Sequence, residues 1–443
     1  MSEMNQTKRQ STDAQVLAAQ ISLLFLVGFI IIYIASSYLQ RSPFENLLSF
    51  YGSDGPGMYP NAALPKPYGV HFFGDFLLPQ WQSNLKDPWV FKEVVGPPVN
   101  NYFPFSMAVF WIFARFSYWH SFLFFIISSF LIFGYPLIKA LENFSALLRT
   151  QIIVSSVILT GPMISLLDRG NLQLLLVALC LLAVHAFNKK KFILSAVLFG
   201  LIIAMKAYPV ILLILFIRAK KWRGLFISAA TAFIATWLPL IFYSGSPLQI
   251  LKSVWENIRI WGDVYAHGYL SYNNSIRGSL LSIEYFQLPY LSSLCNHLYS
   301  NIGLVILGIS LLVAFVLMCP NVPRVEVILV SVAAICGLVD YVAPYTIGMY
   351  FIALYFIWTE EGTVPRIWLI SYGWLIAVLM MPRGLPVKFW NTNFGFDVPT
   401  YTSLLGGICS IGIIVLIFIR HFSANNLRSV LRFDLLKHNF VDQ

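Results

Sequence analysis

Two acidic residues lie in the longest polar stretch of a strongly apolar chain, and they are the first candidates for chemistry. Asp75 belongs to Gly74-Asp75-Phe76, and Asp87 belongs to Asp87-Pro88-Trp89. Charged residues make up only 11% of the chain, and membrane proteins retain charge near the bilayer mainly where function needs it. An acid flanked by aromatic residues suits a general base beside a sugar, because rings stack on sugar faces while a carboxylate accepts the hydroxyl proton. We therefore predict that Asp75 is a catalytic base.

Both acids also have a structural interpretation. Asp75 could cap a helix, and Asp87 before Pro88 is typical of a residue that opens a turn. The turn is the stronger interpretation for Asp87, which we retain as a candidate substrate ligand together with Tyr102 of Tyr102-Phe103-Pro104.

A second polar group, Asp168-Arg169-Gly170-Asn171, lies between two short apolar runs. Asn171 suits a helix N-cap and Gly170 suits a tight turn, but neither role explains Arg169. A charge near the bilayer centre costs roughly 2.5–3.5 kcal/mol on insertion scales, so Arg169 requires an anion. That anion is either a substrate phosphate or Asp168, and Asn171 is a candidate substrate ligand.

The third group is Lys206-Ala207-Tyr208-Pro209, again between short apolar runs. A lysine at a helix break with a tyrosine hydroxyl nearby can hold a phosphate. The alternative is a lysine that extends its charge to the membrane interface.

The fourth group lies in a second long polar region and contains His267, Asn273, Asn274 and Arg277. The asparagines suit sugar hydroxyls, and Arg277 can grip a phosphate with two donors. Turn chemistry and a glycosylation sequon at Asn273-Asn274-Ser275 are the alternatives. Tyr341 and Tyr345 belong to a further polar turn of secondary interest.

The elements that must position these groups are apolar helices. The chain is 58% hydrophobic, and its apolar runs predict about twelve transmembrane or re-entrant helices. We expect an all-α polytopic integral membrane protein, forming one domain over residues 1–443, with spans near 16–38, 119–138, 151–167, 171–187, 192–205, 208–218, 224–244, 301–319, 326–341, 345–358, 366–381 and 401–419.

Short basic loops set the expected orientation. Lys8-Arg9, Lys189-Lys190-Lys191, the run from Arg218 to Arg223 and the basic tail over 420–443 fall on one side, which we assign to the cytoplasm together with both termini. The sizeable loops 40–105 and 245–298, and the loop 382–400, then face outward from a cell (inner) membrane. Within 245–298, stretches 247–260 and 279–298 are amphipathic and suit the interface. The net charge of +10 is explained by membrane lipids, so no nucleic acid partner is expected.

Several kinds of site are missing from the sequence. There is no Walker loop or Rossmann fingerprint, and HExxH and GxSxG are also absent. The five cysteines show no CxxC spacing. We expect no metal and no cofactor, and a site assembled from helix ends and loops.

Taken in order, these motifs resemble glycosyltransferase family 87, whose members include polyprenol-phosphate-mannose-dependent mannosyltransferases. The resemblance runs from about Gly74 to Tyr345 and consists of Asp75-Phe76, Asp87-Pro88-Trp89, Tyr102-Phe103-Pro104, Gly170-Asn171, Lys206-Ala207-Tyr208-Pro209, the run from Arg218 to Trp222, and Asn273-Asn274-Ser275 before Arg277-Gly278. It implies a GT-C glycosyltransferase fold, a polyprenyl-phosphate-linked sugar donor, a lipid- or glycan-linked acceptor, and Asp75 as the base.

Two other functions are consistent with the same features. A transporter or flippase of polyprenyl-linked saccharides would need polar residues deep inside several spans, whereas the polar groups here share one predicted face. A saccharide polymerase or ligase would depend more on arginine and histidine in the second long loop, and its product would be a block of repeats instead of one added sugar.

Overall fold

The structure is a computed structural model that describes residues 15–31, 74–89, 100–268, 273–285, 291–359, 364–381 and 401–422. These residues form helices and their connections, with no strand among them. The expected loop 382–400, the basic tail beyond 422 and Lys8-Arg9 lie outside the described residues.

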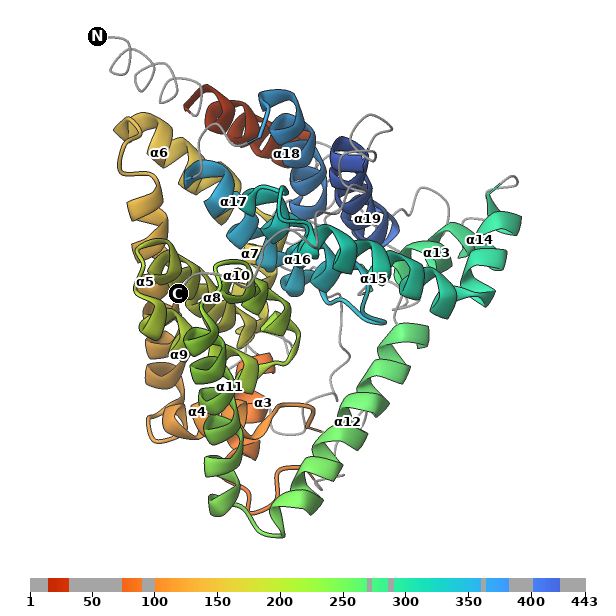
Figure 1. Ribbon diagram of the computed structural model, residues 1–443. Helices are drawn as coiled ribbons and strands as arrows, with labels where there is room; N and C mark the ends of the chain where they lie inside the picture. The colour runs from red at the N-terminus through yellow and green to blue at the C-terminus, as the bar shows by residue number, and fades with distance from the viewer. Residues whose placement is uncertain are drawn as a thin grey trace, which may run out of the picture.

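The helices pack into a bundle (Figure 1). After a helix over Gln15–Ile31, the chain forms α3 (Gly74–Gln82), α4 (Pro104–Phe113), α5 (Tyr118–Ala140), α6 (Ala146–Ile153), η1 (Val154–Ile158), α7 (Gly161–Arg169), α8 (Gln173–Asn188), α9 (Phe192–Met205), η2 (Tyr208–Leu213), α10 (Ile214–Arg218), α11 (Trp222–Trp237), η3 (Leu238–Phe242), α12 (Pro247–Gly268), α13 (Ile276–Tyr285), α14 (Ser292–Ser300), α15 (Ile302–Met318), α16 (Arg324–Gly337), η5 (Pro344–Met349), α17 (Tyr350–Thr359), α18 (Arg366–Met380) and α19 (Tyr401–Phe422).

Membrane-spanning length is found in only some of these helices. Within the described ranges, three are long and apolar enough: His120–Ala140, Trp222–Phe242 and Ser403–Phe422. Two bent pairs, Ala146–Ile158 with Gly161–Leu167 and Ser292–Ser300 with Ile302–Met318, raise the number to five if each pair counts as one span. The other apolar helices are shorter, so the expected total of about twelve remains a prediction.

Most apolar runs of the sequence nevertheless become helices close to the expected bounds. The run expected at 192–205 is α9, and the run at 301–319 is α15. The amphipathic stretch at 247–260 is part of a longer helix, α12, which ends at Gly268. The stretch at 279–298 is divided between α13 and α14.

The short basic loops gather at one end of the bundle. Arg324 donates to the side chain of Asn188 beside the Lys189-Lys190-Lys191 loop, at 3.4 Å. Arg218 donates to the carbonyls of Pro320 and Val322, at 3.0 and 2.6 Å. Both basic loops therefore lie beside residues 320–324, on a common side of the bundle as expected from the sequence.

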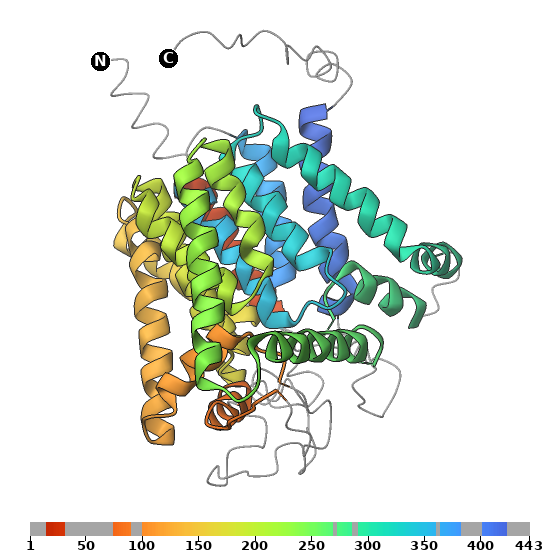
Figure 2. The same cartoon turned by 60° about the horizontal axis from the view of Figure 1, so that its bottom comes forward.

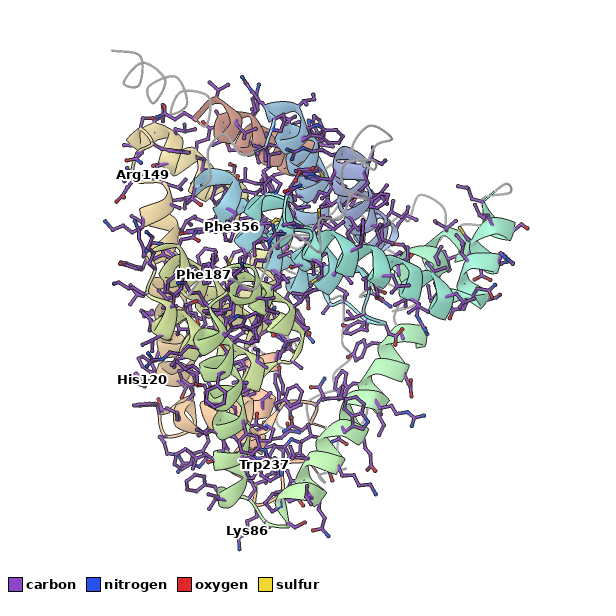
Figure 3. All side chains as sticks on the ribbon, in the orientation of Figure 1. Lys86, His120, Arg149, Phe187, Trp237 and Phe356 are labelled. Carbon is purple, nitrogen blue, oxygen red and sulfur yellow. The ribbon has the colours of Figure 1, made fainter. Side chains whose placement is uncertain are left out.

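The two ends of the bundle can be followed in Figure 3, where Arg149 lies toward one end and Lys86, His120 and Trp237 lie toward the other.

The same end contains a buried carboxylate that joins three helices. Glu326 of α16 is fully buried, and the Tyr372 hydroxyl of α18 donates to it at 2.7 Å. From α19, Arg420 pairs with one of its oxygens and His421 Nε2 lies 2.5 Å from the other. A buried carboxylate needs such partners, because an unpaired charge in the interior is very costly.

At the opposite end, α3 is anchored by an aromatic side chain next to the predicted base. Phe76 is fully buried and packs against Phe110, Phe113, Phe122 and Phe125 of α4 and α5. One turn later, Gln80 donates to Phe113 O and to Ser121 Oγ. Because residues four apart share a helix face, this face of α3 docks on the bundle and fixes the position of Asp75.

The longest helix outside the bundle proper is α12, which crosses the end that carries α3 (Figure 2). Its inward face begins with the buried side chains of Ile250 and Val254. Asn257 continues that face and donates to Trp89 O and Asn100 O, at 3.0 and 2.9 Å. The helix is therefore tied to the loop residues on either side of 90–99.

The Glu326 cluster generates a stability prediction. Replacing Arg420 with Ala leaves a buried carboxylate short of its permanent cation, so we expect the free energy of unfolding to fall by about 3–5 kcal/mol. Thermal unfolding of the purified protein in detergent measures this change. The matched control is Arg366→Ala, which removes an exposed arginine whose partner is Gln20. Equal unfolding temperatures for the two variants would contradict the prediction.

Candidate active site

The predicted base is held by two side chains from another part of the chain. Arg169 Nη2 lies 3.2 Å from Asp75 Oδ1, and the side chains are 13% and 16% exposed. Asn171 Nδ2 donates to Asp75 Oδ2 at 2.7 Å. The carboxylate is therefore fixed at both oxygens and remains partly accessible. The anion described beside Arg169 is Asp75, and the side chain of Asp168 lies outside the described part of the chain.

A left-handed glycine makes this double contact possible. Gly170 ends α7 with φ of +60°, a conformation that glycine adopts without the steric penalty of other residues. The turn places Arg169 and Asn171 on either side of the same carboxylate. Asn171 Oδ1 also accepts from Gln173 N at 2.9 Å, so its amide joins Asp75 to the start of α8.

Lys206 is the second cation of this site. It follows α9 in extended conformation, and Ser106 of α4 donates to the preceding Met205 O at 2.9 Å. Its Nζ lies 5.6 Å from the ring centroid of Tyr345, in cation–π geometry. Burial lowers the pKa of Lys206 to about 8, and the charge of Asp75 opposes that shift.

Tyr345 connects the charged groups to a set of aromatic residues. Four ionisable groups are close enough to interact electrostatically with its hydroxyl: Tyr341, Asp75, Tyr102 and Tyr265. Tyr265 and Tyr341 lie with ring centroids 4.7 Å apart. The site therefore has a charged part, formed by Asp75, Arg169 and Lys206, and an aromatic part beyond Tyr345.

The fourth polar group of the sequence lies beside the aromatic part. Asn273 and Asn274 are fully buried. Asn273 Nδ2 donates to Asp340 O, and Asn274 Nδ2 donates to Val342 O. Arg277 pairs with Asp340 at 3.1 Å. The described contacts hold the turn that carries Tyr341.

Two other sequence candidates, Asp87 and Tyr102, lie beside Trp89, one in the sequence and one through a hydrogen bond. Asp87 precedes a turn at Pro88-Trp89, and Trp89 is buried against Tyr243. Trp89 Nε1 donates to Tyr102 O at 2.9 Å. The ring of Trp89, like that of Phe76, is thus occupied in packing.

The remaining candidates are Tyr208 and His267. The Tyr208 hydroxyl donates to Gln173 Oε1, so it is bonded within the protein. His267 belongs to α12, and its side chain lies outside the described part of the structure.

Sequence reasoning missed the aromatic residues of α12. Trp261 and Tyr265 stack with parallel rings, 4.7 Å between centroids and 3° between planes. With Asn257 they recur every four residues, which places them on one helix face. The expected amphipathic stretch ended at residue 260, just before this pair; a longer window could have found it.

The described structure defines a class of protein: an all-α chain with apolar helices of membrane-spanning length and a charged site at helix ends. The family model of glycosyltransferase family 87 matches residues 101–344, more than half of the chain. The chain belongs to glycosyltransferase family 87, and it is therefore a membrane glycosyltransferase that uses a sugar donor and an acceptor. The matched region contains Arg169, Asn171, Lys206 and Arg277, and it begins after Asp75. A comparison with curated proteins found no match.

The left-handed turn generates a prediction about the site. In the Gly170→Ala variant, a Cβ at φ of +60° costs about 1–2 kcal/mol, and relief of that strain displaces Arg169 and Asn171. We expect transfer activity to fall by more than the accompanying loss of thermal stability can explain. Gly170→Asn should retain more activity, because asparagine tolerates this conformation. Gly134→Ala is the matched control, since a Cβ there meets nothing within 4 Å. Equal activity of the two alanine variants would contradict the prediction.

Proposed function

We propose that this glycosyltransferase moves a hexose, with mannose as the first candidate, from a polyprenyl-phosphate-sugar donor to a lipid- or glycan-linked acceptor. The reaction takes place at the outer face of the cell membrane, with inversion at the anomeric carbon and both termini in the cytoplasm. The observation that supports this most is the convergence of Asp75, Arg169, Asn171 and Lys206 from three segments of the chain.

Asp75 is the general base in this proposal. Each carboxylate oxygen offers two acceptor positions, and Arg169 and Asn171 each use one. The remaining positions can accept the proton of an acceptor hydroxyl. Arg169 and Asn171 orient the carboxylate, so the geometry favours a positioning role for Arg169 over a contact with the substrate phosphate, which is one of the two partners that the sequence leaves open.

The charges of the site favour one anionic substrate group. The described side chains Arg169 and Lys206 supply two positive charges, and Asp75 supplies one negative charge. A polyprenyl-phosphate-sugar is a phosphodiester with a single negative charge, so its binding makes this group neutral. Lys206 is therefore the proposed ligand of the substrate phosphate, because Arg169 is already paired with Asp75.

The proposed reaction is a direct displacement. The acceptor oxygen attacks the anomeric carbon and forms the new glycosidic bond while the bond from that carbon to the phosphate oxygen breaks. The hydroxyl proton passes to Asp75, and the bonding electron pair leaves with the polyprenyl phosphate. Lys206 stabilises the charge that develops on this phosphate. A lipid phosphate is a good leaving group, so one carboxylate suffices where glycoside hydrolysis uses two.

The base assignment is tested with Asp75→Asn, which preserves size and removes the proton acceptor. We expect transfer from a polyprenyl-phosphate-hexose donor to fall by about 10²–10⁴-fold, measured in membranes with matched expression. The control is Asp263→Asn, which makes the same change at an acid of α12 that is 71% exposed. Full activity of a well-expressed Asp75→Asn variant would overturn the assignment.

The role of Lys206 generates a pH prediction. Because the pKa is lowered to about 8, the cation is present at neutral pH and is lost as pH rises through about 8. We expect kcat/KM for the donor to fall over that range, since this ratio reports the free enzyme. Lys206→Arg keeps its charge at high pH and should remove the alkaline decline. An identical decline in both proteins would contradict a phosphate-binding role for Lys206.

A further inference from the structure

Three aromatic rings form a column at the aromatic end of the site. Trp261 and Tyr265 of α12 stack face to face, and Tyr341 packs on Tyr265 at 36° between ring planes. We propose that this column is a platform for the pyranose ring of a substrate. This inference rests on the proposed function, because it deepens the same site.

The platform lies next to the charged part of the site. Tyr345 is within electrostatic reach of both platform tyrosines and of Asp75, and Lys206 lies over the Tyr345 ring. A sugar ring on the platform would thus be close to the proposed phosphate ligand and base. Aromatic faces suit this ligand because they contact the apolar face of a pyranose and leave its hydroxyls to polar groups.

The exposure of the rings supports a binding role over a packing role. The aromatics that anchor α3 and the 83–89 turn, Phe76 and Trp89, are at most 2% exposed. Trp261, Tyr265 and Tyr341 are only partly buried, although they lie on the inward side of α12 and its neighbouring turn. A ring that is held in place and keeps part of its surface exposed can contact a ligand.

The alternative is an interfacial aromatic belt, in which tryptophan lies at the level of the lipid headgroups. On α12 that role fits Trp255, which is 69% exposed. Trp261 follows Asn257 by one turn, and Asn257 is buried with both bonds of its amide nitrogen made to the protein. The two tryptophans therefore lie on different faces of one helix.

The rings are fixed in place by bonds on both sides of the column. Asn257 ties α12 to the carbonyls of Trp89 and Asn100. On the other side, Asn273 Oδ1 accepts a hydrogen bond from Val342 N, and Asn273 Nδ2 donates one to Asp340 O. Asp340 and Val342 flank Tyr341 in the sequence. The buried asparagines thereby hold one ring of the platform in register with the other two.

The platform is tested by binding on the purified full-length protein in detergent, with octyl mannopyranoside and octyl glucopyranoside as probes. We expect Trp261→Ala to weaken binding of at least one probe by about tenfold, which corresponds to about 1.4 kcal/mol. Trp261→Phe retains a ring and should bind as the unmodified protein does. Trp255→Ala is the matched control. If Trp261→Ala and Trp255→Ala bind both probes equally, the platform is excluded.

Kinetics identifies which substrate contributes the ring. A donor sugar predicts that Trp261→Ala raises KM for the polyprenyl-phosphate-hexose, while inhibition by polyprenyl phosphate without sugar is unchanged. An acceptor sugar predicts a rise in KM for the acceptor alone. If the Trp261→Ala variant has a normal kcat and an unchanged KM for both donor and acceptor, the platform is excluded. The proposed function fails by a different result, namely full transfer by Asp75→Asn, and the octyl glycoside measurement is independent of transfer.

Discussion

The structure depends on the short length of its central helices. With 16 and 14 residues, α8 and α9 are about 24 and 21 Å long, whereas the hydrocarbon core of a bilayer is about 30 Å thick. Neither helix alone is long enough to cross that core, and the helical run breaks at their ends. Backbone groups at such breaks need partners, because lipid supplies none. These breaks are where Arg169, Asn171 and Lys206 are found.

The cost of placing charge at these breaks explains how the site is assembled. Arg169 pairs with Asp75 from α3, and Lys206 has the face of Tyr345 and the charge of Asp75 within reach. Each ionised group thus reduces the cost of burying another. The same rule governs the opposite end, where Glu326 is bonded by Tyr372, Arg420 and His421. That cluster joins helices, whereas the Asp75 cluster has a partly accessible carboxylate beside two cations, Arg169 and Lys206.

A fixed scaffold surrounds the accessible groups. Phe76 anchors α3 on the bundle and thereby fixes the position of Asp75. Asn257 and Asn273 hold the aromatic column from two sides. Such preorganisation suits the proposed displacement, in which one proton moves, one bond forms and one breaks. In that proposal the protein supplies orientation and charge, which are the principal means of stabilising a departing phosphate.

The sequence by itself determined the apolar helices, the common side of the described basic loops and most of the charged candidates. These follow from local properties, since hydrophobic runs and charge near the bilayer can be recognised without knowing contacts. Family membership also lay within reach of the ordered motifs. Only the tertiary structure decided the partners. Arg169 meets Asp75 across almost a hundred residues, and Asn273 and Asn274 bind the turn at 340–342 as buried clamps. The stacking of Trp261 and Tyr265 depends on α12 continuing beyond residue 260, and their contact with Tyr341 depends on packing between distant segments. No local pattern specifies which helix ends meet, because that is set by how the whole bundle packs.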